Sequence, residues 1–198
     1  NKKDHKNLQS FFWLFSLDLK SSKKDIQNII LNWIEKNNRY NSENWKVSIV
    51  SKRIIAWISN SKLTYEEGEL EYKQNFNKIV KKQVNHLVNE IEKSQLFEEK
   101  IIGCSAIILA GLSFKDQDRY LNFGLNLLKK IIKIYFDNNC FPKSRNVKHL
   151  NIYLKYFVLI REWLKESQSQ IPEYIDESIY YLGQAYAFIW QNNKKDIL

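Results

Sequence analysis

An all-α fold is the class that this sequence predicts, and three observations support it. Apolar residues recur at three- and four-residue steps over most of the 198 residues, which is the spacing of one face of an α-helix. No segment alternates apolar and polar residues for long enough to indicate a β-strand. The periodic segments are joined by short polar connections, which favour antiparallel neighbouring helices. The sequence therefore predicts a set of antiparallel helical hairpins.

The composition is that of one basic domain. Glycine and proline contribute 5 and 2 residues and do not gather in a run that would mark a linker. We therefore expect a single helical domain over residues 1–198. Lys and Arg number 31 against 22 Asp and Glu, which gives a net charge of +9. A basic balance suits an anionic partner, but the lysines are spread along the chain, and evenly distributed surface charge is the interpretation that we favour.

The first two helices are expected over residues 8–19 and 25–37. The run 8–19 (LQSFFWLFSLDL) is strongly apolar and aromatic, and its length suits a buried helix better than a membrane anchor. Ser22 followed by Asp25 has the spacing of a capping box, which indicates the start of the second helix. The apolar residues on one face of this second helix are Ile26, Ile29, Ile30, Trp33 and Ile34.

Three helices are expected to follow, over residues 47–59, 66–94 and 98–114. The segment 66–94 is amphipathic, with apolar residues at helical steps on one face and Lys, Gln, Asn and Glu on the other. The segment 98–114 begins with acidic residues, as the helix dipole favours. It is apolar almost all round, so we expect it to be the most buried helix. Its small residues Gly103, Ala106, Ala110 and Gly111 would allow neighbouring helices to approach closely.

The last three helices are expected over residues 116–136, 147–166 and 175–191. Ser113 with Asp116 offers a second capping pattern. Pro172 suits the first turn of the final helix, where the N–H that it lacks would have no partner.

The turn before residue 147 gathers the polar side chains of greatest interest. Lys143, Arg145, Asn146, Lys148 and His149 lie at the start of a helix, where free backbone N–H groups and the dipole favour an anion. An alternative is an ordinary solvated connection, in which Ser144 or Asn146 caps the helix and Arg145 stays in solvent.

The remaining reactive residues indicate no metal site and no cofactor. Cys104 lies in an apolar helical run and is expected to be buried, while Cys140 lies in the turn, and neither has the spacing of a metal ligand. His86 is expected to be half-buried. No signal peptide or membrane-spanning run is visible, so we expect no membrane partner, and the sequence leaves the compartment open between periplasm and cytoplasm.

Short motifs occur in order along nearly the whole chain: LQSFFWL at 8–14, NWI at 32–34, Trp45 with SKRIIAWI at 51–58, AGLSF at 110–114, and SRN at 144–146 with LIR at 159–161. These segments resemble the N-terminal helical region of bacterial heparinase II/III-like proteins, a family of polysaccharide lyases. The resemblance implies an (α/α) toroid of helical hairpins. It also implies that this chain is a fragment of a two-domain protein and lacks the β-sandwich that follows the toroid in the family.

The resemblance implies a chemistry as well as a fold. Lyases of this family cut uronate-containing chains by β-elimination, which needs a base for the C5 proton, a group that neutralises the adjacent carboxylate, and an acid for the leaving oxygen. The positions of this chain that match the family's turn make His149 and Asn146 the catalytic candidates. Arg145, Lys143 and Lys148 are the candidates for substrate binding, and a bidentate Arg145 would suit a carboxylate or sulfate.

The chain also departs from the family's catalytic motifs. The place of the Gly-Asn-His motif reads Phe97, Glu98 and Glu99, and His149 stands where the Ser-Pro-x-Tyr-His motif has its tyrosine. A glutamate there would repel a substrate carboxylate. Whether the protein is an enzyme is therefore open, and we expect the isolated chain to be inactive.

Three functions are compatible with these observations. The first is the helical domain of a heparinase II/III-like lyase that binds acidic polysaccharide. The second is a non-catalytic glycan-binding or scaffold domain that kept only the fold. The third, a nucleic-acid binder, would need a concentrated basic face with stacking aromatics, which the sequence lacks. The tryptophans Trp33, Trp57, Trp163 and Trp190 are expected in the core rather than stacked on sugar rings.

Overall fold

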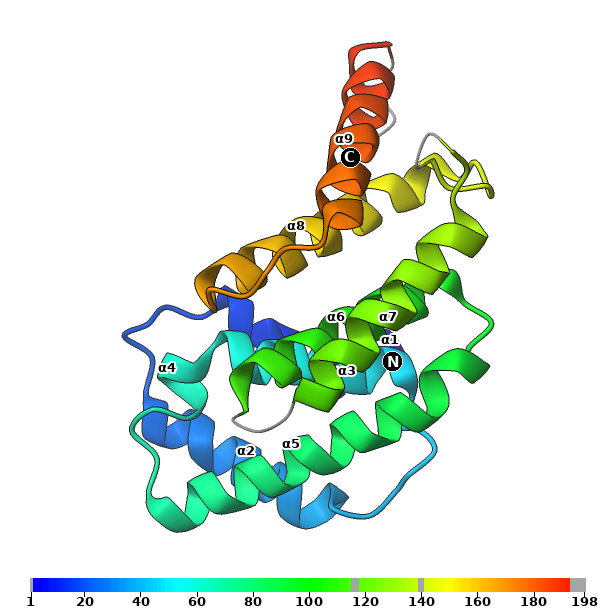
Figure 1. Ribbon diagram of the computed structural model, residues 1–198. Helices are drawn as coiled ribbons and strands as arrows, with labels where there is room; N and C mark the ends of the chain where they lie inside the picture. The colour runs from blue at the N-terminus through cyan, green and yellow to red at the C-terminus, as the bar shows by residue number, and fades with distance from the viewer. Residues whose placement is uncertain (1, 115–117, 139–140, 193–198) are drawn as a thin grey trace. The chain divides into compact units, whose positions relative to one another are not determined.

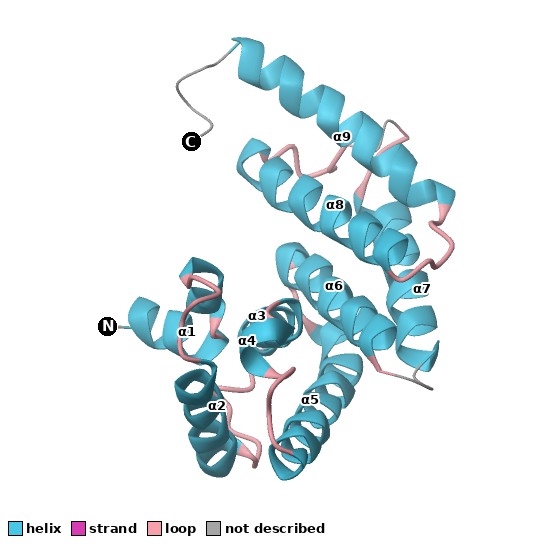
Figure 2. Cartoon of the chain, turned by 90° about the vertical axis from the view of Figure 1, so that its left-hand side faces the viewer, coloured by secondary structure: helices cyan, strands magenta, loops and turns pink. Residues whose placement is uncertain are grey.

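The computed structural model describes residues 2–114, 118–138 and 141–192, without the side chains at 2, 3, 148 and 192. Within these residues the chain is helix and loop, and its β pairing is limited to an isolated bridge between Phe136 and Pro142 (Figures 1 and 2). The all-α class predicted from the sequence is therefore confirmed.

The contacts divide the chain into two compact units, Asn1–Ser94 and Gln95–Leu198, and each is described by itself. The prediction of one domain over residues 1–198 stays a prediction. The first unit contains α1 (Lys2–Ser10), the 3-10 helix η1 (Phe12–Ser16), α2 (Lys23–Asn37), α3 (Val47–Ser59), α4 (Ser61–Thr64), α5 (Leu70–Glu90) and the 3-10 helix η2 (Ile91–Lys93). The second contains α6 (Phe97–Ser113), α7 (Asp118–Tyr135), the 3-10 helix η3 (Val147–His149), α8 (Leu150–Glu166) and α9 (Glu173–Asn192).

The prediction of one buried helix over residues 8–19 is wrong. The α-helix ends at Ser10, and Phe11 adopts a left-handed backbone conformation, with φ 54°. This turn places the Phe11 ring edge-on against Trp57 and Trp33, at centroid distances of 5.2 and 6.1 Å. Burying one large ring in an aromatic cluster outweighs the cost of the unusual backbone conformation.

The next helices follow the sequence prediction more closely. The Ser22 hydroxyl accepts the N–H of Asp25 at 3.3 Å and caps α2 as expected, and α3 has the predicted bounds. The helix predicted over 66–94 is shorter, because Tyr65 and Gly68 form a turn before it. The Tyr72 hydroxyl then donates a 2.6 Å hydrogen bond to the carbonyl of Thr64, which ties α5 to this turn.

Arg53 joins the elements of the first unit from a fully buried position on α3. Its Nε donates to the side chain of Gln83 at 2.8 Å, and its Nη1 and Nη2 donate to the carbonyls of Gln9 at 2.8 Å and Asn44 at 3.1 Å. The guanidinium also lies over the Trp33 ring, 4.0 Å from a ring centroid. Burial lowers the pKa of Arg53, and these four partners replace the water that a buried charge loses.

Helix α6 is the buried centre of the second unit, as predicted. Residues 101–111 are buried without interruption, and α6 packs against α7 and α8 (Figure 2). A Cβ atom at Gly111 would lie 2.5 Å from the backbone nitrogen of Leu121, and one at Gly124 would lie 2.7 Å from Cγ1 of Ile108. The close packing of α6 on α7 therefore requires glycine on both helices.

Two sequence expectations fall outside the described residues, namely the capping role of Asp116 and the position of Cys140. Cys104 is fully buried, as expected for a small apolar residue of α6.

Replacing Ile107 with alanine should lower the free energy of unfolding by about 2–5 kcal/mol, because it leaves a cavity beside a fully buried position on α6. Ile29→Ala is the matched control. The helical pattern assigned Ile29 to the buried face of α2, but its side chain is 46% exposed, so the loss should stay below about 1 kcal/mol. Chemical denaturation of both variants measures the difference, and equal losses would contradict the placement of α6 in the core.

Candidate functional site

A hollow of about 210 Å³ lies where α7 ends and α8 begins, within the second unit. Three of the five residues that the sequence singled out line it, namely Lys143, Asn146 and His149. The complete lining is Phe97, Ile134, Tyr135, Pro142, Lys143, Ser144, Asn146, His149 and Tyr153. The walls are therefore largely apolar, with a few polar groups on one side, which is the usual character of a ligand site.

The turn beside the hollow is shaped by Asp137. The backbone N–H of Asp137 donates to the carbonyl of Phe141 at 2.9 Å, while its Oδ1 accepts the N–H of Phe141 at 3.0 Å. Its Oδ2 pairs with Nη2 of Arg145 at 2.8 Å. One carboxylate thus bonds to two residues of the turn, and the bridge between Phe136 and Pro142 flanks the bonds between Asp137 and Phe141.

Arg145 does not line the hollow. Its backbone is left-handed, with φ 54°, and its guanidinium pairs with Asp137 and lies over the Phe141 ring, 5.1 Å from the centroid. The side chain is nevertheless 63% exposed, so an anion in solvent can reach it. In the alternative of an ordinary connection Arg145 stays in solvent, and the structure adds that the Asp137 carboxylate partly neutralises its charge.

Lys143 is held at the end of α7. Its backbone N–H donates to the carbonyl of Tyr135, and its ammonium donates to the carbonyl of Ile134, both at 2.8 Å. A cation is favoured at the C-terminal end of a helix, where carbonyl groups lack partners. The side chain of Lys148, the fifth candidate, lies outside the described part of the structure.

His149 is half-buried and lies between two other residues of the hollow. Its Nδ1 is 3.1 Å from the Tyr153 hydroxyl, and its Nε2 is 3.4 Å from Nδ2 of Asn146. The tautomer with the proton on Nδ1 satisfies both contacts, since the histidine then donates to Tyr153 and accepts from Asn146. In that state Nε2 carries the acceptor lone pair of the ring, which can take a proton only when Asn146 no longer donates to it.

The N-cap position of α8 is occupied by His149, whose side chain contacts Tyr153 but accepts no backbone N–H of the helix. Ser144 instead accepts the N–H of Asn146 at 3.4 Å and so supports the turn. In the alternative of an ordinary connection Ser144 or Asn146 would cap this helix, but the N-cap position of α8 is occupied by His149.

Tyr153 is the residue that the sequence reasoning missed. Its side chain is 1% exposed, and burial, together with the charge of Glu98, raises the pKa of its hydroxyl to about 12. The hydroxyl therefore stays protonated at neutral pH. The available signal was its spacing from His149, since residues four apart lie on the same side of a helix.

The structure also brings the place of the missing Gly-Asn-His motif to this hollow. The Phe97 ring lies 4.7 Å from the Tyr135 ring and 4.9 Å from the Tyr153 ring, centroid to centroid. Its neighbour Glu98 supplies a negative charge that acts on Tyr153 and Tyr156. The segments at the places of the two family motifs therefore meet at this hollow. The segment that contains Phe97 and Glu98 contributes an aromatic wall and an acidic side chain instead of an amide and an imidazole.

The other candidates, four tryptophans and His86, are buried or half-buried. Trp33 and Trp57 belong to the core, as expected, whereas Trp163 and Trp190 are half-buried. His86 is also half-buried, and its Nε2 lies 2.8 Å from the carbonyl oxygen of Trp45.

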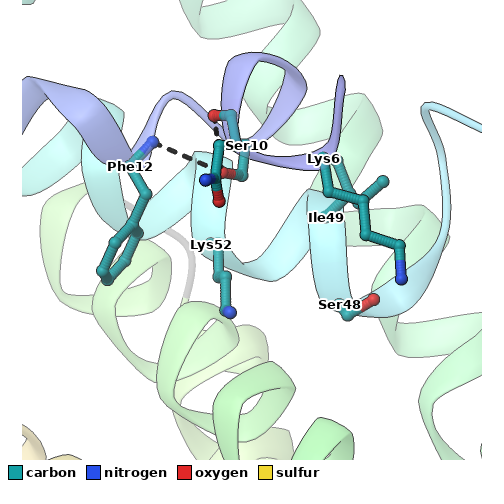
Figure 3. Close-up of a pocket in the computed structure, with 7 residues that line it drawn as sticks. Lys6, Ser10, Phe12, Ser48, Ile49 and Lys52 are labelled. Atoms are coloured by element: carbon teal, nitrogen blue, oxygen red, sulfur yellow. Dashed lines mark hydrogen bonds between the residues drawn. The ribbon is translucent and has the colours of Figure 1, made fainter. Parts of the chain in front are cut away.

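The first unit has a smaller hollow of about 80 Å³ between α1 and α3. Lys6, Ser48 and Lys52 lie along it, and the hydroxyl of Ser10 accepts the N–H of Phe12 at its edge (Figure 3). The described residues hold no group of three His, Cys, Asp or Glu side chains placed to bind a metal ion. No helix in the same part of the chain has the length and apolar character that crossing a membrane requires.

The raised pKa of Tyr153 can be tested by titration. The neutral phenol is favoured in the folded state, so this stabilisation is present below pH 10 or so and is lost as the pH rises towards 12. Subtracting the ultraviolet titration curve of Tyr153→Phe from that of the unaltered protein should leave one tyrosine that ionises near pH 12. A difference curve with its midpoint near pH 10 would show that the hydroxyl is in contact with water.

Comparison with known proteins supports the fold. No protein-family model matches the chain, and no curated protein sequence matches it significantly. The crystal structure of heparan sulfate lyase HepC from Pedobacter heparinus is similar, with a TM-score of 0.66 at 16% sequence identity. The match covers 95% of this chain and 31% of the lyase chain, so this chain spans about a third of that protein. The likeness confirms the predicted all-α toroid of helical hairpins and shows a polysaccharide-lyase-like fold, while membership of the heparinase II/III-like family stays a prediction.

Proposed function

We propose that this chain is a helical domain of a heparinase II/III-like polysaccharide lyase, and that it binds acidic, uronate-containing polysaccharide for β-elimination at the hollow between α7 and α8. One observation carries the proposal: in a chain with a lyase-like fold, the hollow coincides with the turn at which Lys143, Asn146 and His149 gather. A basic chain, with a net charge of +9, suits such a partner.

The lining supports a sugar ligand. The rings of Phe97 and Tyr135 offer an apolar wall to the face of a sugar ring, while Asn146, Ser144 and Lys143 offer hydrogen-bond donors to its polar edge. At about 210 Å³ the hollow is smaller than most sites that enclose a whole drug-sized ligand. It would therefore hold one unit of a longer chain that continues into solvent.

The polar groups suggest roles in β-elimination. With a substrate bound, the Asn146 amide would turn from Nε2 of His149 to the carboxylate beside C5 and donate to it as charge develops, and the released Nε2 would take the C5 proton. Tyr153 would act as a positioning residue, because its hydroxyl contacts Nδ1 of the same histidine from a buried position. Lys143 and Arg145 would bind anionic groups near the entrance, with Lys148 as a further candidate on the same turn.

A second candidate is a glycan-binding domain without catalysis, and one observation favours it. Glu98 lies close enough to Tyr153 to raise the pKa of the tyrosine, so a carboxylate in the hollow would meet a negative charge from the protein. This repulsion opposes the stabilisation that an enolate intermediate requires.

Removing the ion pair between Asp137 and Arg145 should strengthen polysaccharide binding. Asp137→Asn removes the ion pair with Arg145 but keeps an oxygen that accepts the N–H of Phe141, so affinity for heparin and alginate should rise by about two- to fivefold. Asp18→Asn is the matched control, because it adds the same charge and keeps an acceptor for the N–H of Lys20. Calorimetric titration measures both, and an equal gain in the control would show a generic charge effect.

The converse change gives the second half of this test. Arg145→Ala should weaken binding and cancel the gain from Asp137→Asn, whereas loss of the pair Lys23 and Lys24 in the first unit should not. An unchanged affinity after Arg145→Ala, or an equal loss when Lys23 and Lys24 are replaced, would show that the turn contributes only ordinary surface charge.

The isolated 198-residue chain should not cleave polysaccharide. Elimination needs a base, an acid and a carboxylate neutraliser held together, and residues 97–99 supply two glutamates where the family has an amide and an imidazole. Incubation with heparin, heparan sulfate, hyaluronan or alginate should give no rise in the ultraviolet absorbance of unsaturated uronate ends. Steady product formation that His149→Ala abolishes would show that the groups present suffice.

A further inference from the structure

A second, larger hollow lies in the first unit, between the end of α2 and the middle of α5, which pack side by side (Figure 1). Its volume is about 340 Å³. The lining residues are Ile34, Asn38, Arg39, Asn75, Lys78, Ile79 and Lys82. Three cations therefore line this hollow, which we call the groove, and the lining contains no carboxylate.

Lys82 is the cation with a structural role. Its ammonium donates to the backbone carbonyl of Asn38 and lies over the Trp45 ring, 5.7 Å from a ring centroid. This contact places a positive charge on the carbonyl end of α2, where the helix dipole would otherwise repel an anion.

Arg39 and Lys78 make no comparable contact with the end of α2. Both are exposed, and in the described part of the chain no side-chain hydrogen bond or ion pair links the guanidinium of Arg39 or the ammonium of Lys78 to a neighbour. Glu35 and Glu71, the nearest acids along the same two helices, do not line the groove. Bringing three like charges together without a counter-charge costs free energy, which a bound anion would recover.

The rest of the lining indicates what kind of anion fits. The floor is formed by Ile34 and Ile79, which are buried, so an apolar surface lies beneath the cations. The amides of Asn38 and Asn75 add hydrogen-bond donors and acceptors. A carboxylate has two oxygens to share among three cations, whereas a sulfate or phosphate ester has three terminal oxygens and an organic body that can lie on the floor.

We propose that the groove formed by Arg39, Lys78 and Lys82 binds the sulfate or phosphate group of an organic ester. The proposal goes beyond the function proposed above and does not depend on it, because all of its residues belong to the first unit and none belongs to the hollow of the second. Each site can therefore fail without the other.

The test is an NMR titration of the assigned 198-residue protein at constant ionic strength. The probes are inorganic sulfate, inorganic phosphate, N-acetylglucosamine 6-sulfate and glucose 6-phosphate, with N-acetylglucosamine as the uncharged reference. The signals to follow are the Nε–H of Arg39 and the side-chain amides of Asn38 and Asn75. These signals should shift saturably with the charged probes and stay still with N-acetylglucosamine.

The decisive variant is Arg39→Gln with Lys78→Gln, which removes these two cations and leaves Lys82 in place. It should weaken the binding of the charged probes at least about fivefold. The first control, Lys24→Gln with Lys62→Gln, removes the same charge from exposed positions of the same unit. The second control, Lys6→Gln with Lys52→Gln, removes the same charge from the smaller hollow (Figure 3). Both controls should bind as the unaltered protein does.

The probes also separate the possible sources. Tighter binding of the sulfated sugar than of the phosphorylated one would assign the groove to sulfate esters, and the reverse order would assign it to phosphate esters. The absence of saturable shifts, or equal weakening in either control, would overturn the proposal.

Discussion

The carboxylate of Asp137 is the constraint on which the candidate site depends. It accepts the N–H of Phe141 and pairs with Arg145, so it closes the connection between α7 and α8 into one defined turn. The closed turn places Lys143 against the last carbonyls of α7 and leads the chain into His149 at the start of α8. Without an oxygen at this position to accept the N–H of Phe141, the turn would open and the polar groups of the hollow would lose their shared support.

The first unit also stabilises an arginine, but with neutral partners and not with a carboxylate. Arg53 is a buried cation whose hydrogen-bond and ring partners are neutral: the side chain of Gln83, the carbonyls of Gln9 and Asn44, and the Trp33 ring. Hydrogen bonds and an aromatic face therefore take the place that Asp137 fills for Arg145. Because those partners lie on α1, α2, α5 and the connection before α3, one side chain ties together segments that are far apart in the sequence. Arg145 is largely exposed, so an anion in solvent can compete with Asp137 for its guanidinium, whereas Arg53 is fully buried.

The sequence predicts those helix bounds and buried faces that depend on interactions between residues close together in the chain. Helical periodicity and capping gave α2, α3 and α6 nearly at their observed bounds, and the apolar character of α6 predicted its burial. The break at Phe11 could not be foreseen, because it depends on an aromatic cluster with Trp33 and Trp57 that only the tertiary fold assembles. The same limit applies to the site: motif spacing identified Asn146 and His149, but the pairing of Arg145 with Asp137 and the contact from Tyr153 to His149 follow from backbone geometry that residue types do not encode.

The central claim is that the hollow between α7 and α8 is where this protein binds an acidic sugar, and the most direct measurement is a crystal structure with a uronate-containing oligosaccharide bound. The account predicts a uronate unit against the Phe97 and Tyr135 rings, with its carboxylate within hydrogen-bond distance of Asn146 and its C5 facing Nε2 of His149. An oligosaccharide bound at another surface, with this hollow unchanged from the unbound protein, would contradict it.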